Sequence, residues 1–306
     1  MSVEDRGHLL TEQLDATRPP LDALSIEDGL QRLAEEDAQA VAAVEAARPA
    51  LAAAVRLFTR VLGANGRILA VGAGTSGRLA TLDFSELPPT FGADPAQFVA
   101  AIAGGATALT RAVEGAEDDA EAGARAVRDL DLGPGDACLG VAAGGTTPYV
   151  HGALDEARAR GAGTVFMACV SEDQVPSTAD VSIRLLCGPE PVQGSTRMKA
   201  GTATKLALNA LSTLAMVQLG KVHGGRMVDV DTRANVKLVD RGLRLVSELG
   251  PVSRERAAEL LEAAEGHVKT AVAMAWLDSD ASEARHALDA VEGHLGRLPR
   301  EDQGCS

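Results

Sequence analysis

The ten residues "VGAGTSGRLA" (71–80) place Gly72, Gly74 and Gly77 in the spacing G-x-G-x-x-G. They follow the apolar run "RILA" (67–70) and precede a segment with helical periodicity. A glycine-rich turn from a buried strand into a helix presents backbone N–H groups and the positive end of the helix to an anion. The stretch therefore predicts a β-α unit with an anion site. It leaves open whether the ligand is NAD or another phosphate, or whether the glycines only turn the chain.

Four further short apolar runs follow, and segments with helical periodicity separate them. The runs are 98–104, 137–145, 163–170 and 181–188, and the helical segments are 75–87, 106–130 and 147–161. Such alternation is typical of βαβ units, which bury a parallel sheet between helices on both faces. The sequence predicts an α/β fold with a doubly wound parallel sheet.

The segments that flank these units are helical. From Ser25 to about Leu62 the apolar spacing predicts two helices, the second starting near Pro49. After Gly225 we expect no further strands, only helices. The predicted organisation is an N-terminal helical arm (1–55), an α/β domain (56–228) and a C-terminal helical subdomain (229–306).

Composition restricts the class of protein. The 306 residues carry a formal net charge of −14, which disfavours binding to nucleic acid or to an anionic membrane surface. Aromatic residues make up only 2%, so the core must be aliphatic and rich in alanine. The first ten residues, "MSVEDRGHLL", lack a basic region followed by an apolar stretch, so we expect no secretory signal. The most apolar stretch (206–220) is short and interrupted by polar residues, so we expect a cytoplasmic protein. The four cysteines have no C-x-x-C spacing and the histidines are scattered, so we expect no metal.

The loops after the runs favour a phosphate monoester over NAD. A dinucleotide site needs an acidic residue at the end of the second strand, but "AIAGGATAL" (101–109) contains none. Hydroxyl-rich loops recur after the first, third and fifth runs, and such loops converge at one edge of a parallel sheet. The residues that we expect to bind a sugar phosphate are Gly74, Thr75, Ser76, Gly77, Gly145, Thr146, Thr147, Ser195, Thr196, Arg197 and Lys199.

The chain resembles the SIS (sugar isomerase) fold and, within it, the N-acetylmuramic acid 6-phosphate etherases. The matching stretches are "GAGTSGRL" (72–79), "LDFSELPPTFG" (82–92), "IAGG" (102–105), "AVEGAEDD" (112–119), "GSTRMKAGTATKLALN" (194–209), "GKVHGGRMVDV" (220–230) and "NVKL" (235–238). The resemblance implies cleavage of the D-lactyl ether of N-acetylmuramate 6-phosphate, giving N-acetylglucosamine 6-phosphate and D-lactate, in cell-wall sugar recycling. No nucleotide motif or metal cluster is visible, so we expect no cofactor.

That reaction needs two proton-transfer groups. Opening the sugar ring gives an aldehyde that acidifies the C2 proton, so one group takes this proton while an acid protonates the departing ether oxygen. The resemblance assigns Glu86 as the acid and Glu117 as the general base or as a second acid–base residue. Glu114 and Asp118 are close rivals for the second role, and the alternative reading of Glu86 is a solvated residue at a helix end. Lys221 and His223 are further candidates for substrate contact, although His223 also suits a helix end.

Some positions depart from the family pattern. Gly144 and Thr146 stand where the second loop usually has Ser and Arg, and Leu14 and Asp15 stand where the N-terminal segment usually has Arg and Asn. Ala234 replaces the usual Thr or Ser. The departures are compatible with an altered sugar or with weaker binding.

Two other functions stay open at this point: an aldose–ketose phosphosugar isomerase, and a non-catalytic phosphosugar sensor. The two retained carboxylates favour catalysis. SIS domains commonly pair, and the arm before Leu62 is long and apolar enough to cross a partner. We therefore expect a homodimer in which the second chain completes the pocket.

Overall fold

The computed structural model describes residues 5–230, 232 and 236–299, and these residues form two compact units. The first unit comprises the chain up to Ser85 together with Pro95–Ser212. The second comprises Glu86–Asp94 and the chain from Thr213 onward. The three-part division at residues 55 and 228 stays a prediction. Within the described residues, no helix is both long and apolar enough to cross a bilayer.

The first unit is built on a five-stranded parallel sheet with the order β2-β1-β3-β4-β5. Its strands are β1 (Ile68–Gly72), β2 (Phe98–Ile102), β3 (Ala137–Val141), β4 (Gly163–Ala168) and β5 (Val181–Arg184). Each predicted apolar run contains one of them. Every residue of the central strands β1 and β3 is buried, as expected for a sheet covered on both faces. The predicted doubly wound α/β fold is confirmed.

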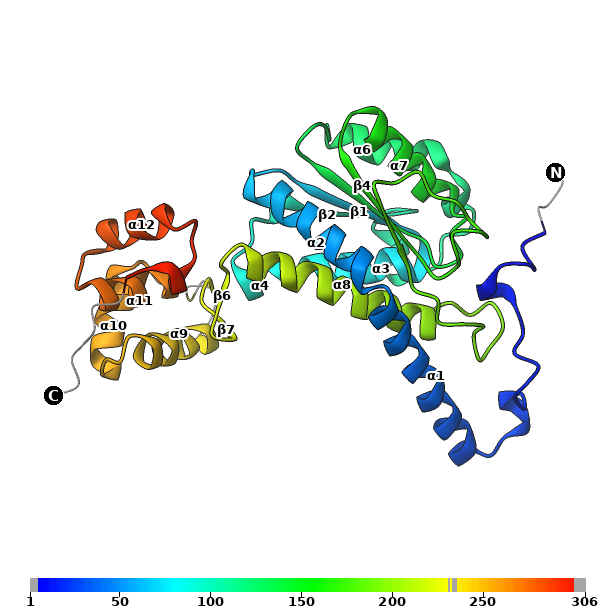
Figure 1. Cartoon of the computed structure of the whole chain (residues 1–306), viewed down its shortest axis with the longest axis horizontal. Helices are drawn as coiled ribbons and strands as arrows, with labels where there is room; N and C mark the ends of the chain where they lie inside the picture. The colour runs from blue at the N-terminus through cyan, green and yellow to red at the C-terminus, as the bar shows by residue number, and fades with distance from the viewer. Residues whose placement is uncertain (1–4, 231, 233–235, 300–306) are drawn as a thin grey trace. The chain divides into compact units, whose positions relative to one another are not determined.

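Helices cover both faces of this sheet. The helical elements of this part of the chain are α1 (Ile26–Ala46), α2 (Arg48–Gly63), α3 (Gly74–Ser85), α5 (Thr107–Thr110), α6 (Ala120–Asp129), α7 (Pro148–Ala159) and α8 (Lys199–Gln218), with the 3-10 turns η1 (Leu10–Glu12), η2 (Leu21–Ala23), η3 (Pro95–Gln97) and η4 (Ala116–Asp118). In Figure 1, α6 and α7 lie on one face, and α2, α3 and α8 lie on the other. Ser25 caps α1 by accepting a hydrogen bond from the backbone N–H of Asp28.

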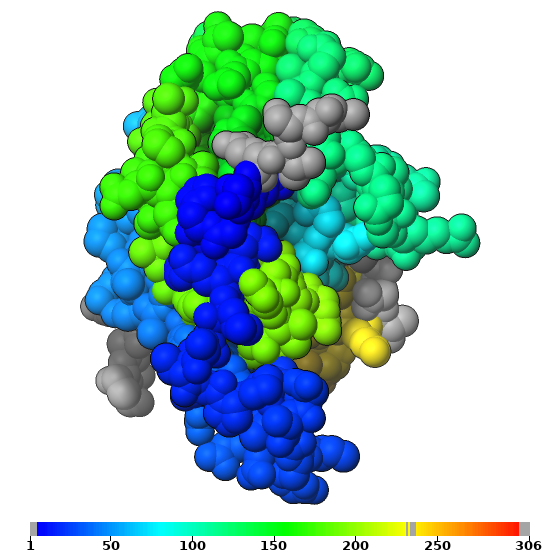
Figure 2. Space-filling view, turned by 90° about the vertical axis from the view of Figure 1, so that its right-hand side faces the viewer, coloured from blue at the N-terminus to red at the C-terminus, as the bar shows by residue number. Residues whose placement is uncertain are grey.

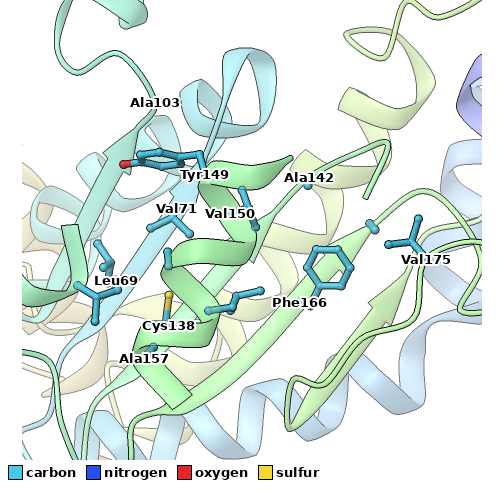
Figure 3. Close-up of a cluster of buried hydrophobic side chains, with 14 of the residues drawn as sticks. Leu69, Val71, Ala103, Cys138, Ala142, Tyr149, Val150, Ala157, Phe166 and Val175 are labelled. Atoms are coloured by element: carbon cyan, nitrogen blue, oxygen red, sulfur yellow. The ribbon is translucent and has the colours of Figure 1, made fainter. Parts of the chain in front are cut away.

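The core between α7 and the sheet is aliphatic and rich in small residues, as the composition predicts. Val150 and Ala157 of α7 lie over Val71 and Cys138 of the strands (Figure 3). Small side chains let the helix approach the sheet closely, and burial of the aliphatic ones supplies most of the stabilisation.

The second unit is mainly helical. Its elements are α4 (Leu87–Phe91), β6 (Val222–His223), β7 (Arg226–Met227), α9 (Val236–Leu249), α10 (Arg254–Ala263), α11 (Val268–Leu277), α12 (Ala281–Ala290) and η6 (Leu295–Arg297). Buried side chains such as Val246, Leu260, Val272 and Leu288 form its own core.

The expectation that no strand follows Gly225 is wrong, because β6 and β7 form an antiparallel hairpin. Gly224 and Gly225 both have positive φ, at +55° and +74°. A Gly-Gly pair adopts this backbone without the steric cost that a Cβ brings, and a two-residue loop of this kind is typical of hairpins.

Candidate active site

The sheet has its topological switch point between β1 and β3, since β2 lies on one side of this pair and β4 on the other. Open parallel sheets bind ligands outside the carboxyl ends of the strands at such a point. A pocket of the first unit lies there. Its lining residues are Arg6, Leu9, Glu12, Ala73, Gly74, Thr75, Ser76, Glu117, Asp118, Ala142, Ala143, Gly144, Thr146, Thr147, Pro148 and Thr196.

The loop after β1 supplies an open helix N-terminus. α3 begins at Gly74, and Gly74, Thr75 and Ser76 line the pocket. The N–H groups of a first helical turn have no intrahelical partner, and they carry the positive end of the helix dipole. Together with two hydroxyls, this end of α3 is suited to a compact anion.

Gly77 lies outside the pocket lining and has a packing role. A Cβ at this position would lie 2.7 Å from the carbonyl oxygen of Gly72 and 2.6 Å from Cγ1 of Ile102. The third glycine of the motif therefore lets α3 approach the sheet, while the residues before it face the ligand.

The loop after β3 contributes the side chains of Thr146 and Thr147. Thr147 is the N-cap residue of α7, but its hydroxyl makes no capping bond to the described backbone of that helix, so it can serve a ligand. Gly145 lies behind the lining, where its carbonyl oxygen lies 2.6 Å from Nε2 of His151. That contact ties the loop to α7.

The loop before α8 reaches the pocket only through Thr196, whereas Ser195 and Arg197 lie outside the lining. The N-terminus of α8 already holds a carboxylate of the protein itself. The backbone N–H groups of Lys199 and Ala200 donate to Glu190 at 3.0 Å each. Burial raises the pKa of Glu190, and the bonds from this helix end act in the opposite direction.

Lys199 also lies away from the pocket. Its side chain is only 2% exposed, and its Nζ donates to Oε2 of Glu36 and, at 2.8 Å, to Oε1 of Gln39. Both acceptors belong to α1. The structure therefore joins Lys199 to the helical arm, and it does not bring this ammonium group to the ligand pocket.

Glu117 lines the pocket because the predicted helix 106–130 is broken. α5 ends at Thr110, and Gly115, with φ of +73°, precedes the turn η4. This turn places Glu117 and Asp118 in the pocket lining, and Glu114 lines an adjoining hollow that Glu117 shares. The expectation of a continuous helix is wrong here, since the chain turns at Gly115 instead.

The N-terminal segment contributes three lining residues that the sequence prediction missed: Arg6, Leu9 and Glu12. One signal was present, because the apolar pair "LL" (9–10) stands between the polar residues 4–8 and 11–13. Leu9 is only 2% exposed and belongs to the core cluster beside α7. Of the departures from the family pattern, Gly144 and Thr146 line the pocket, Leu14 and Asp15 do not, and Ala234 lies outside the described residues.

Three predicted site residues belong to the second unit: Glu86, Lys221 and His223. Glu86 is exposed at the N-cap of α4. Lys221 pairs with Oδ2 of Asp229 at 2.8 Å, and the ring of His223 packs edge-on against Trp276 with centroids 5.6 Å apart. The participation of all three in the pocket stays a prediction.

Two comparisons match only part of the chain. The model of the glucokinase regulatory protein N-terminal SIS domain matches residues 50–158. The solved phosphoheptose isomerase from Neisseria gonorrhoeae is 20% identical, with a TM-score of 0.44, and covers 60% of this chain and 97% of its own.

Two relatives match over nearly the full length. The N-acetylmuramic acid 6-phosphate etherase of Synechocystis sp. is 52% identical over 294 residues, covering 96% of this chain and 96% of the relative. The protein of the same name from Crocosphaera subtropica is 50% identical over 294 residues, with the same coverage of both chains. Because half of the residues are identical over 96% of the chain, the chain belongs to the N-acetylmuramic acid 6-phosphate etherase family.

Proposed function

We propose that the protein is a carbon–oxygen lyase that removes D-lactate from N-acetylmuramate 6-phosphate and leaves N-acetylglucosamine 6-phosphate. The observation that carries the proposal is the family membership at about half identity over 96% of the chain. The pocket at the switch point supports it, because hydroxyls and an open helix N-terminus suit the 6-phosphate.

In this proposal the phosphate binds at the N-terminus of α3. Gly74, Thr75 and Ser76 offer N–H groups and hydroxyls, and Thr147 and Thr196 add hydroxyls from the other two loops. Glu190 already occupies the end of α8, so a second anion there would meet a buried carboxylate. The phosphate-binding role predicted for Lys199 is therefore not part of the proposal.

The chemistry proceeds by elimination followed by hydration. In the ring-opened substrate the aldehyde acidifies the C2 proton, and the carboxylate of Glu117 takes it. The C3–O bond breaks, and Glu86 in its acid form protonates the departing lactate oxygen. Water then adds to C3 of the unsaturated aldehyde, which restores the C3 hydroxyl and returns a proton to C2. Proton-transfer residues typically contribute about 10²–10⁴-fold to the rate.

The pocket favours Glu117 over its neighbours for the C2 proton. Glu114 faces the adjoining hollow rather than the hydroxyl-rich lining, whereas Asp118 shares the lining but has a shorter side chain. Glu86, Lys221 and His223 stay candidate site residues in this proposal, and we expect Lys221 and His223 to be supplied by a second copy in a homodimer. The cytoplasmic location is also part of the proposal.

Release of D-lactate from N-acetylmuramate 6-phosphate by the purified protein tests the function. We expect Glu117→Gln to lower the turnover by about 10²-fold or more and to slow exchange of the C2 proton with deuterated water. Glu86→Gln should slow lactate release with little effect on the affinity for N-acetylglucosamine 6-phosphate. Glu114→Gln is the matched control and should stay active.

The alternatives give different results in the same assay. A sensor binds the phosphosugar but shows neither C2 exchange nor lactate release. An isomerase exchanges the C2 proton and converts an aldose phosphate into a ketose phosphate without releasing lactate. Either pattern in the wild-type protein would refute the proposed reaction.

A further inference from the structure

The N-terminal segment, residues 5–13, is a fixed wall of the pocket. The side chain of Gln174 makes two hydrogen bonds with this segment. It donates to the carbonyl of His8 at 2.7 Å and accepts from the N–H of Leu10 at 3.3 Å. Gln193 donates to the carbonyl of Glu12 at 2.8 Å. Figure 2 shows the segment, in dark blue, lying against the green surface of later parts of the first unit. Contacts with two separate loops and the buried Leu9 hold this segment in one position.

A buried hydroxyl of this segment lacks a partner next to the pocket. Thr11 is 1% exposed, and its Oγ1 makes no hydrogen bond among the described residues. The same oxygen lies 3.6 Å from the position that a Cβ on Gly144 would take, and Gly144 lines the pocket. Leaving a buried hydroxyl unsatisfied costs about 1–3 kcal/mol. Thr11 does not itself line the pocket, but its hydroxyl has no hydrogen bond to lose among the described residues, so the side chain can turn toward an acceptor bound there.

Arg6 is the one cationic side chain among the described residues that line the pocket, where it accompanies Glu12, Glu117 and Asp118. Its guanidinium forms no ion pair with any described residue. Arg6 is exposed at the edge of the pocket, so its guanidinium is free to turn toward a ligand. A guanidinium is matched to a carboxylate, which accepts two parallel hydrogen bonds from it and can accept a third from a neighbouring hydroxyl.

We propose that Arg6, with the hydroxyl of Thr11, binds the carboxylate of the lactyl group and so distinguishes the substrate from phosphosugars that lack it. This inference rests on the proposed function. The substrate carries two anionic groups, and the end of α3 is suited to the phosphate. The carboxylate then needs a cation, and Arg6 is available in the same lining.

Two variants test the assignment: Arg6→Gln, and Thr11→Val, which keeps the shape of the side chain. Arg125→Gln is the control, because it removes the charge of an exposed arginine on α6. We expect Arg6→Gln to raise KM for N-acetylmuramate 6-phosphate by about 10- to 100-fold, the range for hydrogen bonds to a charged group. Thr11→Val should raise it by roughly fivefold. Inhibition by N-acetylglucosamine 6-phosphate should be unchanged in both, and Arg125→Gln should resemble the wild type.

Two results would overturn the assignment. If Arg6→Gln weakens the binding of N-acetylglucosamine 6-phosphate as much as it weakens the binding of the substrate, then Arg6 binds the phosphate. If it weakens neither, Arg6 binds no part of the ligand. Should the wild type release no lactate, the proposed reaction fails, and calorimetric affinities for the same two phosphosugars still decide the inference. The inference is supported if the wild type binds the carboxylate-bearing sugar more tightly and Arg6→Gln abolishes this preference. Equal affinities of the wild type for the two sugars refute the inference.

Discussion

Lys199 shows how a single residue can carry the signature of a ligand site and serve the fold instead. It follows a Gly-Ser-Thr loop, yet its ammonium group is buried between α8 and α1. Its partner Glu36 also lies within 3.6 Å of Arg18 and Arg32, so one carboxylate holds three cations. An isolated buried charge is strongly unfavourable, so the charges of this cluster need one another for the folded state to be stable.

We expect Lys199→Met to lower the free energy of unfolding by about 3 kcal/mol, since it removes one member of a buried ion pair. The affinity of the folded variant for N-acetylglucosamine 6-phosphate should stay within about twofold, because the side chain does not line the pocket. Urea denaturation and calorimetry measure the two quantities. Arg197→Gln, an exposed cation of the same loop, should change neither. Normal stability combined with weak binding would instead make Lys199 a phosphate ligand.

Sequence patterns predicted those site residues whose position depends only on their neighbours in the chain. Gly74, Thr75 and Ser76 lie at the end of their own strand, so strand-then-glycine spacing was enough to place them in the pocket. Arg6 was not predictable in this way, because its position depends on a contact between Leu10 and Gln174, 164 residues apart in the chain. The capping of α8 by Glu190 likewise depends on how the loop after β5 folds back, and residue spacing does not contain that information.

At the scale of elements, Asp136 joins the beginnings of the two central strands. Its carboxylate accepts from the backbone N–H of Arg67 at 2.8 Å, from the guanidinium of Arg67 at 2.7 Å and from the N–H of Gly133 at 3.1 Å. Burial favours the neutral acid, but these donors outweigh burial and lower the pKa of Asp136 below its ordinary value of 3.8. The ionised form therefore stabilises the register of β1 against β3.

The hydrogen bonds of Asp136 predict that the free energy of unfolding depends on pH. Because the folded pKa is lowered, the unfolded chain binds the proton first as the pH falls. The stabilisation is complete above about pH 4 and is lost as the pH falls through the folded pKa. We expect Asp136→Asn to cost roughly 1–3 kcal/mol at neutral pH, and the difference from the wild type should shrink below about pH 4. Urea unfolding over a pH series measures this, and exposed Asp129→Asn is the control; a difference that stays constant down to about pH 2 would contradict the account.

At the scale of the whole molecule, α1 leaves an apolar stripe exposed. Ile26 is 78% exposed and Leu30 64%, and Val41 lies on the same side of the helix. The other side carries Arg32 and Glu36, which join the arm to the first unit, and in Figure 1 α1 extends beyond the sheet. Scattered exposed apolar residues are ordinary, but a stripe along one helix face is typical of an interaction surface.

We expect this stripe to contact a second copy of the chain in the proposed homodimer. Leu30→Asp would place a charge in that contact, so sedimentation equilibrium at micromolar concentration should show a monomer where the wild type shows a dimer. Leu82→Asp, at a similarly exposed leucine on α3, is the matched control and should leave the dimer intact. If the second copy completes the pocket, lactate release by Leu30→Asp should fall and recover as the protein concentration rises, because association follows mass action. A wild type that is monomeric and fully active would contradict both the dimer and the shared pocket, whereas a dimer that survives Leu30→Asp would place the contact elsewhere.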